Sequence, residues 1–192
     1  MPRLFFAVET PDILKKELVK LQDAIAADFQ KMIPAPNFKP EHLANSHCTI
    51  RFLGNVGESN VETIITAART ALSQMRIHPF ECNLSACGVF PNRRQARVMW
   101  IGLSPEDPFE TIQRAIDASL LAAGIPFEIE HSFHPHLTLF RFREPYRLPP
   151  DFDFPDLTSL SLLARISELA LIESKTFAEG TEHIIRAKFE LK

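Results

Sequence analysis

Two kinds of hydrophobic pattern follow one another along the chain. Short apolar or alternating runs predict buried and half-buried strands, whereas apolar residues that recur every three or four positions predict amphipathic helices. The expected strands cover residues 4–8, 47–53, 80–89, 96–103, 136–142, 168–173 and 185–191. The expected helices cover residues 11–29, 59–75 and 108–123.

Local signals mark where these helices begin and end. Thr10-Pro11 offers a capping hydroxyl followed by a proline at the first helical position. Ser59 and Glu62 have the spacing of a capping box. Gly124 is expected to end the third helix, because glycine readily adopts the left-handed conformation found there. Prolines are expected to fill loops at residues 34–40 and 145–155.

The order strand, helix, strand occurs twice. The last strand of each unit begins with His-x-Thr, at His47 and at His136, and these two motifs lie 89 residues apart. So long a period with only two copies does not indicate a solenoid. We therefore expect one domain, residues 1–192, with an α+β fold. It would have two pseudo-symmetric lobes of mainly antiparallel sheet, helices outside, and a central cleft to which each lobe contributes one strand.

Composition and charge exclude several classes of protein. With 45% hydrophobic and 23% charged residues, the chain is that of an ordinary globular protein and not of a disordered one. Only 6 of the 192 residues are glycine, which disfavours a glycine-rich phosphate loop. A net charge of −3 disfavours a protein that grips a long nucleic-acid backbone, but it permits a small anionic substrate.

The cellular setting is expected from three further features. No run of about 18 apolar residues is present, and the chain opens on a strand-like segment and not on a signal peptide. Three cysteines, Cys48, Cys82 and Cys87, have no metal-ligand spacing, and an odd number makes a poor disulfide framework. We expect a monomer in a reduced, cytoplasmic compartment, with no membrane association and with Cys48 as a small buried hydrophobe.

The two His-x-Thr motifs carry the candidate chemistry. Residues two apart on a strand point to the same face, so His47 projects with Thr49 and His136 projects with Thr138. Imidazole accepts or donates a proton near neutral pH, and two of them can act as acid and base together. Threonine hydroxyls can donate hydrogen bonds to phosphate oxygens. If the two strands face one another, these four groups suit phosphoryl transfer without a metal ion.

The chain resembles the two-histidine (2H) phosphoesterases, and most of all their RNA 2′,3′-cyclic phosphodiesterase branch, the 2′-5′ RNA ligase-like proteins. The resemblance covers nearly the whole chain. It rests on Arg3-Leu4-Phe5-Phe6-Ala7, His47-Cys48-Thr49-Ile50-Arg51-Phe52-Leu53-Gly54, Phe90-Pro91 with Arg97-Val98-Met99-Trp100, Pro135-His136-Leu137-Thr138-Leu139-Phe140-Arg141, and Glu173-Ser174 with Gly180. The chain departs from the family pattern at Cys48, where a larger apolar residue is usual, and near His183, where tyrosine is common.

The resemblance implies hydrolysis of a terminal 2′,3′-cyclic phosphate on RNA ends or small nucleotides, leaving a 2′-phosphate, with no metal or cofactor. His136 would be the proton acceptor that activates water, and His47 the proton donor to the leaving 3′ oxygen. Thr49 and Thr138 would hold the phosphate oxygens, and Arg141 would neutralise charge in the transition state. The family also joins RNA ends through a 2′-5′ linkage in vitro, with the same acid and base.

Two arginines are ambiguous on strand alternation alone. Strict alternation places Arg51 on the face of His47, where it would bind substrate, and aims Arg141 away from His136. Arg93 and Arg94 are expected in a solvated turn, and His42, His78 and His183 are expected at the surface or as caps.

Three alternative functions remain open from the residues. His131, His134 and His136 could together hold a metal ion, which would make the protein a metal hydrolase. The same two-histidine site could serve a 2′-5′ oligonucleotide phosphodiesterase, which needs room for a second nucleotide. A non-catalytic module that binds nucleotides or RNA ends would bind the cyclic end without turnover.

Overall fold

The computed structural model describes residues 1–32, 38–129, 132–157, 162–177 and 180–192. The α+β class expected from the sequence is confirmed. No helix within these described ranges is long and apolar enough to cross a membrane. In chain order the elements are β1 (Arg3–Glu9), α1 (Asp12–Met32), β2 (Phe38–Pro40), η1 (Leu43–Asn45), β3 (His47–Asn55), η2 (Glu58–Asn60), α2 (Val61–Met75), β4 (Phe80–Phe90), β5 (Ala96–Ser104), α3 (Asp107–Ala122), β6 (His136–Tyr146), β7 (Ala164–Ile166), β8 (Glu168–Phe177) and β9 (Gly180–Glu190).

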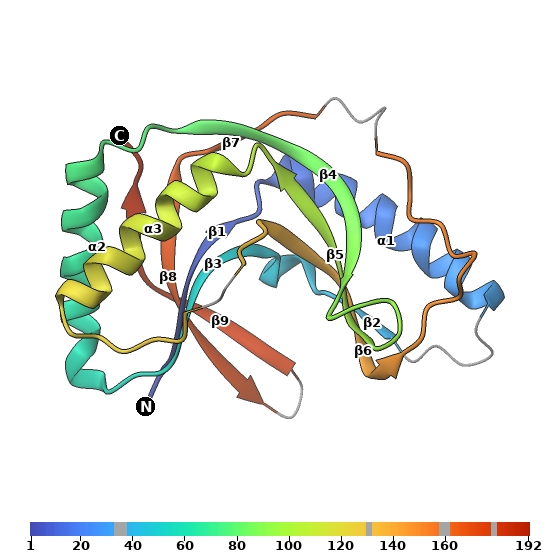
Figure 1. Cartoon of the computed structure of the whole chain (residues 1–192), viewed down its shortest axis with the longest axis horizontal. Helices are drawn as coiled ribbons and strands as arrows, with labels where there is room; N and C mark the ends of the chain where they lie inside the picture. The colour runs from blue at the N-terminus through green and yellow to red at the C-terminus, as the bar shows by residue number, and fades with distance from the viewer. Residues whose placement is uncertain (33–37, 130–131, 158–161, 178–179) are drawn as a thin grey trace.

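The strands form two sheets, and the described strand pairs are antiparallel (Figure 1). The first sheet has the order β3-β1-β8-β9, and the second has the order β2-β6-β5-β4-β7. Strand β3 lies at the edge of the first sheet and contacts β6 of the second. The two strands that begin with His-x-Thr are therefore neighbours in space, although one belongs to each sheet.

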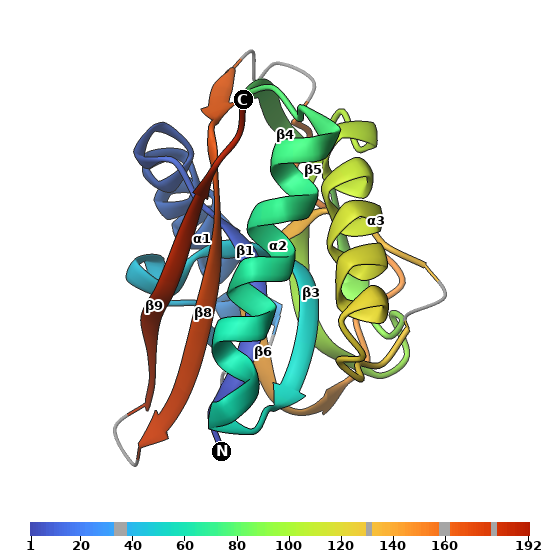
Figure 2. The same cartoon turned by 90° about the vertical axis from the view of Figure 1, so that its left-hand side faces the viewer.

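The helices are exchanged between the two repeat units, as Figures 1 and 2 show. Helix α1 follows β1 of the first sheet, yet its Phe29 ring packs on Phe140 and Phe142 of β6, at 6.2 and 5.9 Å between centroids. Helix α3 follows β5 of the second sheet, yet its Asp117 pairs with Arg51 of β3. Each lobe has helices outside, as expected. Each repeat unit nevertheless covers the sheet of the other unit, which its sequence order does not reveal.

Several expected boundaries differ in the structure. Helix α2 has Asn60 as its N-cap with no side-chain capping bond, so the capping box predicted at Ser59 and Glu62 is wrong. The preceding residues instead form the short 3-10 turn η2. Strand β6 continues through Pro145, where a loop was expected. Gly124, with φ of 69°, follows the end of α3 as expected. The expected loop residues Pro34 and Pro36 lie outside the described residues.

One hydrophobic cluster joins the lobes. It contains Leu4 and Ile50 from the first sheet, Leu139 and Phe140 from the second, and Leu18 from α1, all of them fully buried. Complete burial of a leucine, isoleucine or phenylalanine contributes about 1.5–3 kcal/mol each. Because β3 and β6 both anchor buried side chains in this common core, the histidine strands have rigid support.

Candidate active site

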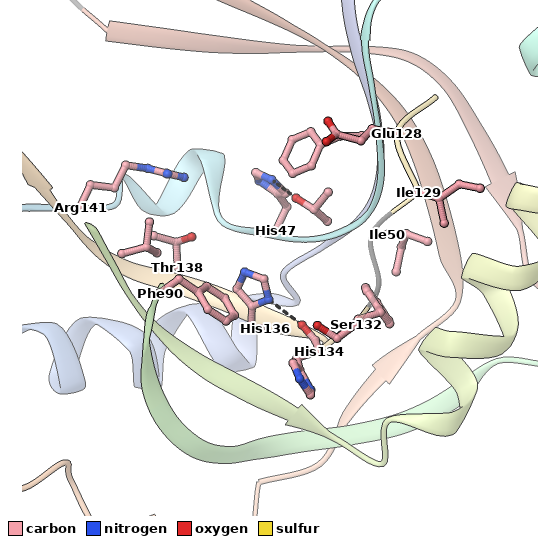
Figure 3. A pocket seen from close by; sticks show the side chains of 14 residues that line it. His47, Ile50, Phe90, Glu128, Ile129, Ser132, His134, His136, Thr138 and Arg141 are labelled. Carbon is pink, nitrogen blue, oxygen red and sulfur yellow. Dashed lines mark hydrogen bonds between the residues drawn. The ribbon is translucent and has the colours of Figure 1, made fainter. Parts of the chain in front are cut away.

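A cleft of about 600 Å³ opens where β3 and β6 meet. Five of the six predicted site residues line it, and Arg51 does not. Figure 3 shows His47, His136, Thr138 and Arg141 around the same space. The lining consists of His47, Thr49, Ile50, Phe52, Phe90, Val98, Glu128, Ile129, Ser132, Phe133, His134, His136, Thr138 and Arg141.

His47 is held by two hydrogen bonds at the start of β3. Its Nδ1 lies 2.6 Å from the Asn45 carbonyl oxygen. A carbonyl can only accept, so Nδ1 carries the proton and donates it. In the neutral ring Nε2 is then the acceptor, and the Thr49 hydroxyl, 3.0 Å away, donates to it. The unprotonated nitrogen of His47 therefore points at the hydroxyl that its own motif supplies.

His136 repeats this arrangement at the start of β6. Its Nδ1 lies 2.6 Å from the carbonyl oxygen of His134, again two residues earlier in the chain, and donates to it. The bond is drawn in Figure 3. With Nδ1–H held in this way, Nε2 of the neutral ring carries the lone pair that can accept a proton. Both imidazoles thus have the same tautomer fixed by the backbone, and both can exchange protons through Nε2.

Burial makes both histidines weak bases in the free protein. Burial, with smaller contributions from His183, Arg141 and His136, lowers the pKa of His47 to about 4, against the hydrogen bond from Nδ1 to Asn45. Burial also lowers the pKa of His136, assisted by His134 and Arg141. Both rings are neutral at pH 7 before a ligand binds. A bound phosphate places negative charge beside them and favours the protonated forms.

A bulge in each histidine strand decides which later side chain enters the cleft. Along β6, Met99 pairs with Phe140 but Trp100 pairs with Thr138, so Leu139 is an extra residue without a partner across the ladder. The bulge reverses the alternation that follows it. It brings Arg141 to the face of His136 and Thr138, where strict alternation would not place it. Arg141 Nε donates to the Glu41 carboxylate at 2.7 Å.

An equivalent bulge in β3 turns Arg51 away from the cleft. The expectation that Arg51 shares the face of His47 and Thr49 is therefore wrong. Phe6 pairs with Arg51 but Ala7 pairs with Thr49, which leaves Ile50 as the extra residue. Arg51 is 2% exposed, and its guanidinium donates to both carboxylate oxygens of Asp117 on α3, at 2.7 and 2.6 Å. Arg51 therefore joins α3 to the sheet, and it is Phe52 that enters the cleft.

Aromatic rings flank both imidazoles. The ring centroid of Phe90 lies 5.0 Å from that of His136 and 5.1 Å from that of Trp100, on which it stacks. A Cβ on Gly88 would collide with the Trp100 ring, so glycine is required there. Phe5, on the strand expected at residues 4–8, is buried at 2% exposure and also lies against His47, with ring centroids 4.9 Å apart. Phe90 and the half-exposed Phe52, which line the cleft, suit the stacking of a nucleobase.

Two residues of the site were missed by the sequence analysis. Glu41, which binds Arg141, lies between the predicted loop at residues 34–40 and the predicted strand at residues 47–53, with no motif around it. His183 was expected at the surface or as a cap, but its ring lies 5.0 Å from that of His47, and burial lowers its pKa. The only signal for His183 was its place near a position where the resembled family has tyrosine.

The structure places the remaining singled-out residues as follows. In Figure 3 the His134 ring points away from His47 and His136, and it lies 3.9 Å from the Glu106 carboxylate. His131 is outside the described residues. Arg93 is not a solvated turn residue, because it donates to the carbonyls of Pro149 and Phe152. Four others lie as expected. His42 caps η1, His78 and Arg94 are exposed, and Cys48 is buried, which raises its pKa to about 12.

Known proteins share this sequence pattern. A family model described as LigT like phosphoesterase matches residues 9–100. A protein of Methanothermobacter thermautotrophicus named RNA 2′,3′-cyclic phosphodiesterase is 33% identical over 144 residues, which cover 74% of this chain and 72% of the relative. An Escherichia coli K12 protein of the same name is 29% identical over 150 residues, covering 77% of each chain.

Solved structures share the fold. The crystal structure of a Thermus thermophilus protein, TT0787, superposes with a TM-score of 0.76 at 25% identity, covering 98% of this chain and 97% of that one. The structure of E. coli LigT complexed with 3′-AMP superposes with a TM-score of 0.70 at 24% identity, covering 100% of this chain and 98% of that one. The two-lobed arrangement is therefore that of a known fold.

Proposed function

The chain belongs to the LigT-like phosphoesterases of the two-histidine family, and on that premise we propose that it is an RNA 2′,3′-cyclic phosphodiesterase that opens a terminal cyclic phosphate to a 2′-phosphate. One observation carries the proposal. Two imidazoles with the same backbone-fixed tautomer present Nε2 to one cleft, from strands of different lobes. Such a pair can take a proton on one side of a phosphate and give one on the other.

In the reaction we propose, His136 Nε2 removes a proton from water as the water oxygen bonds to phosphorus. The bond from phosphorus to the 3′ oxygen breaks, and His47 Nε2–H gives its proton to that oxygen. The product keeps the phosphate on the 2′ oxygen. Thr49 and Thr138 hydroxyls donate to the non-bridging oxygens, and the Arg141 guanidinium stabilises their charge. With the 5′ hydroxyl of a second RNA in place of water, the same steps form a bond from phosphorus to the 5′ oxygen and break the bond to the 3′ oxygen, which joins the two ends through a 2′-5′ linkage.

His47 must be protonated before it can act as the proton donor, and the free protein disfavours its protonated form. Burial is the main cause that lowers the pKa of His47, to about 4. A bound phosphate raises that pKa, because its negative charge stabilises the imidazolium. Proton uptake by His47 is thereby coupled to substrate binding, which keeps the acid ready only when a phosphate is present.

A second candidate, a 2′-5′ oligonucleotide phosphodiesterase, is favoured by a second hollow. It has a volume of about 290 Å³ and shares His47, Phe52 and Arg141 with the main cleft. It continues past His183 to hydroxyl groups on β8 and β9, at Ser174, Thr176 and Thr181. A nucleotide on each side of the scissile phosphate could occupy the two hollows. Comparing an oligonucleotide with a cyclic end to a 2′-5′ linked dinucleotide separates the candidates, because the preferred substrate has the higher kcat/KM.

The test of the main proposal is turnover of a short RNA that ends in a 2′,3′-cyclic phosphate, with a chelator present. We expect a 2′-phosphate product. His47→Ala and His136→Ala should each lower kcat by at least about 100-fold, because each removes one proton-transfer group. His78→Ala, an exposed histidine outside the cleft, is the matched control and should retain full activity.

Three outcomes would contradict the mechanism. Full activity in either cleft variant would show that the acid–base pair is not used. Loss of activity in the chelator, restored by zinc, would favour a metal hydrolase that uses His131, His134 and His136. Tight binding of the cyclic end without turnover would indicate a binding module.

A further inference from the structure

Two buried glutamines occupy equivalent places in the exchanged helices. Gln22 lies on α1 and Gln113 on α3, with 9% and 8% of their surface exposed. Gln22 Nε2 donates to the Leu139 carbonyl at 3.0 Å, and Gln113 Nε2 donates to the Ile50 carbonyl at 3.1 Å. Leu139 and Ile50 are the two bulged residues, each directly after the threonine of its His-x-Thr motif. Each bulge is therefore held by a helix of the other repeat unit.

The bulge takes Leu139 out of the ladder with β5, yet the Leu139 carbonyl also accepts the Glu41 N–H, so Gln22 is not there to rescue an unbonded carbonyl. A glutamine amide has two N–H groups, and Gln22 uses both of them. The second goes to the Glu41 carbonyl at 3.0 Å, while Glu41 N–H donates to Leu139 O at 2.9 Å. Gln22 thus ties the backbones of Leu139 and Glu41 together.

Leu139 and Glu41 each help to fix the position of Arg141. Leu139 lies two positions before it, and the bulge at Leu139 sets the face on which Arg141 emerges. The Glu41 carboxylate receives Arg141 Nε at 2.7 Å. The Arg141 side chain itself is 56% exposed, so the surrounding packing does little to fix its rotamer. The backbone at Leu139 and the carboxylate of Glu41 are the two restraints, and Gln22 bonds the main-chain carbonyls of both residues.

We propose that Gln22 is a positioning residue that directs the Arg141 guanidinium to the phosphate. This rests on the proposed function, because Arg141 has that role only if the cleft binds a phosphate. Gln113 is the counterpart on the other strand. Its bulge presents Phe52, so it acts on the side of the cleft that holds His47 and not on Arg141.

The experiment is a double-mutant cycle between Gln22 and Arg141. Gln22→Met keeps the length of the side chain and removes both donors, and Arg141→Ala removes the guanidinium. We measure kcat/KM on RNA with a 2′,3′-cyclic end and the Kd of adenosine 2′-phosphate. We expect Gln22→Met to lower kcat/KM and to raise the Kd about tenfold each in the wild-type background, the scale of one hydrogen bond to a charged group. In the Arg141→Ala background Gln22→Met should change kcat/KM and the Kd by less than about twofold, since the guanidinium that Gln22 positions is absent.

Gln113→Met in the same two backgrounds is the matched control, and its effect should be equal in both. An equal effect of Gln22→Met in both backgrounds would show a merely structural role and overturn the proposal. A Gln22→Met protein with unchanged kcat/KM and Kd would also overturn the proposal. Gln22→Glu, which keeps the shape and lacks the amide donors, is run in parallel in case the methionine variant does not fold. A wild-type protein with no turnover would contradict the proposed function, and the Kd cycle would then decide the role of Gln22.

Discussion

At the scale of single residues, a bulge determines which arginine reaches the cleft. Arg51 and Arg141 are both charged residues a few positions after a histidine, and strict alternation assigns them to the wrong faces. The strand motif predicted His47, Thr49, His136 and Thr138 on the cleft, because two residues that precede the bulge keep the regular alternation. A bulge depends on the neighbouring strand and helix, so no local pattern revealed it.

The two arginines should respond to substitution in opposite ways. Arg51→Met leaves Asp117 without this buried partner, and we expect it to lower the free energy of unfolding by about 3 kcal/mol. Its activity per folded molecule should stay within about twofold of the wild type. Arg141→Met should keep the stability and lose activity. Urea unfolding and the RNA assay measure both effects, and a stable but inactive Arg51→Met protein would contradict the assignment.

The pH dependence should reflect the low basicity of both imidazoles. For kcat/KM, which reports the free protein, His136 must be neutral and His47 charged. Burial lowers both pKa values, that of His47 to about 4, so the alkaline limb of kcat/KM should lie below pH 6.5. The alkaline limb of kcat should lie at higher pH, because bound phosphate raises the pKa of His47. Rates at constant ionic strength test this, and a kcat/KM that stays level up to pH 8 would contradict it.

At the scale of elements, the hydrophobic pattern predicted the long helices and most strands, but not how they are distributed. The periodicity of α1 and the apolar run of β1 were clear in the sequence, since each depends on its own residues. Strands β2 and β7 have three residues each, too few for any period to show, and they are fixed by pairing with β6 and β4. That α1 packs on the second sheet and α3 on the first depends on contacts between distant segments.

At the scale of the whole molecule, the exchanged helices make the two lobes depend on one another. The first lobe is covered by α3 from the second half of the sequence, and the second lobe is covered by α1 from the first half. Helix α2, from the first half, also contacts the first sheet at β9, so each lobe combines elements from both halves of the sequence. A cleft between lobes that fold together keeps its geometry, which acid–base catalysis by one group from each lobe requires.

The two lobes should therefore unfold together. Trp100, the only tryptophan, reports on the second lobe, while far-UV circular dichroism reports on both. In urea the two signals should have one midpoint. Phe29→Ala removes a fully buried ring from α1 and should lower both midpoints equally, at a cost of about 3–5 kcal/mol. Ile13→Ala, at a half-exposed position of α1, is the control and should change little. Separate midpoints would show independent lobes.

The sequence by itself determined the secondary-structure class, the repeat and the two His-x-Thr pairs. These follow from residue type and from spacings of a few positions, where the geometry of a strand or helix is regular. Only the tertiary structure decided that Phe52 enters the cleft, that Arg51 pairs with Asp117, and that Glu41 and His183 lie at the site. It also gave the reason why Arg141, expected there from the resemblance, reaches the face of His136. Each of these depends on a partner far away in the chain, which the local pattern around a residue does not identify.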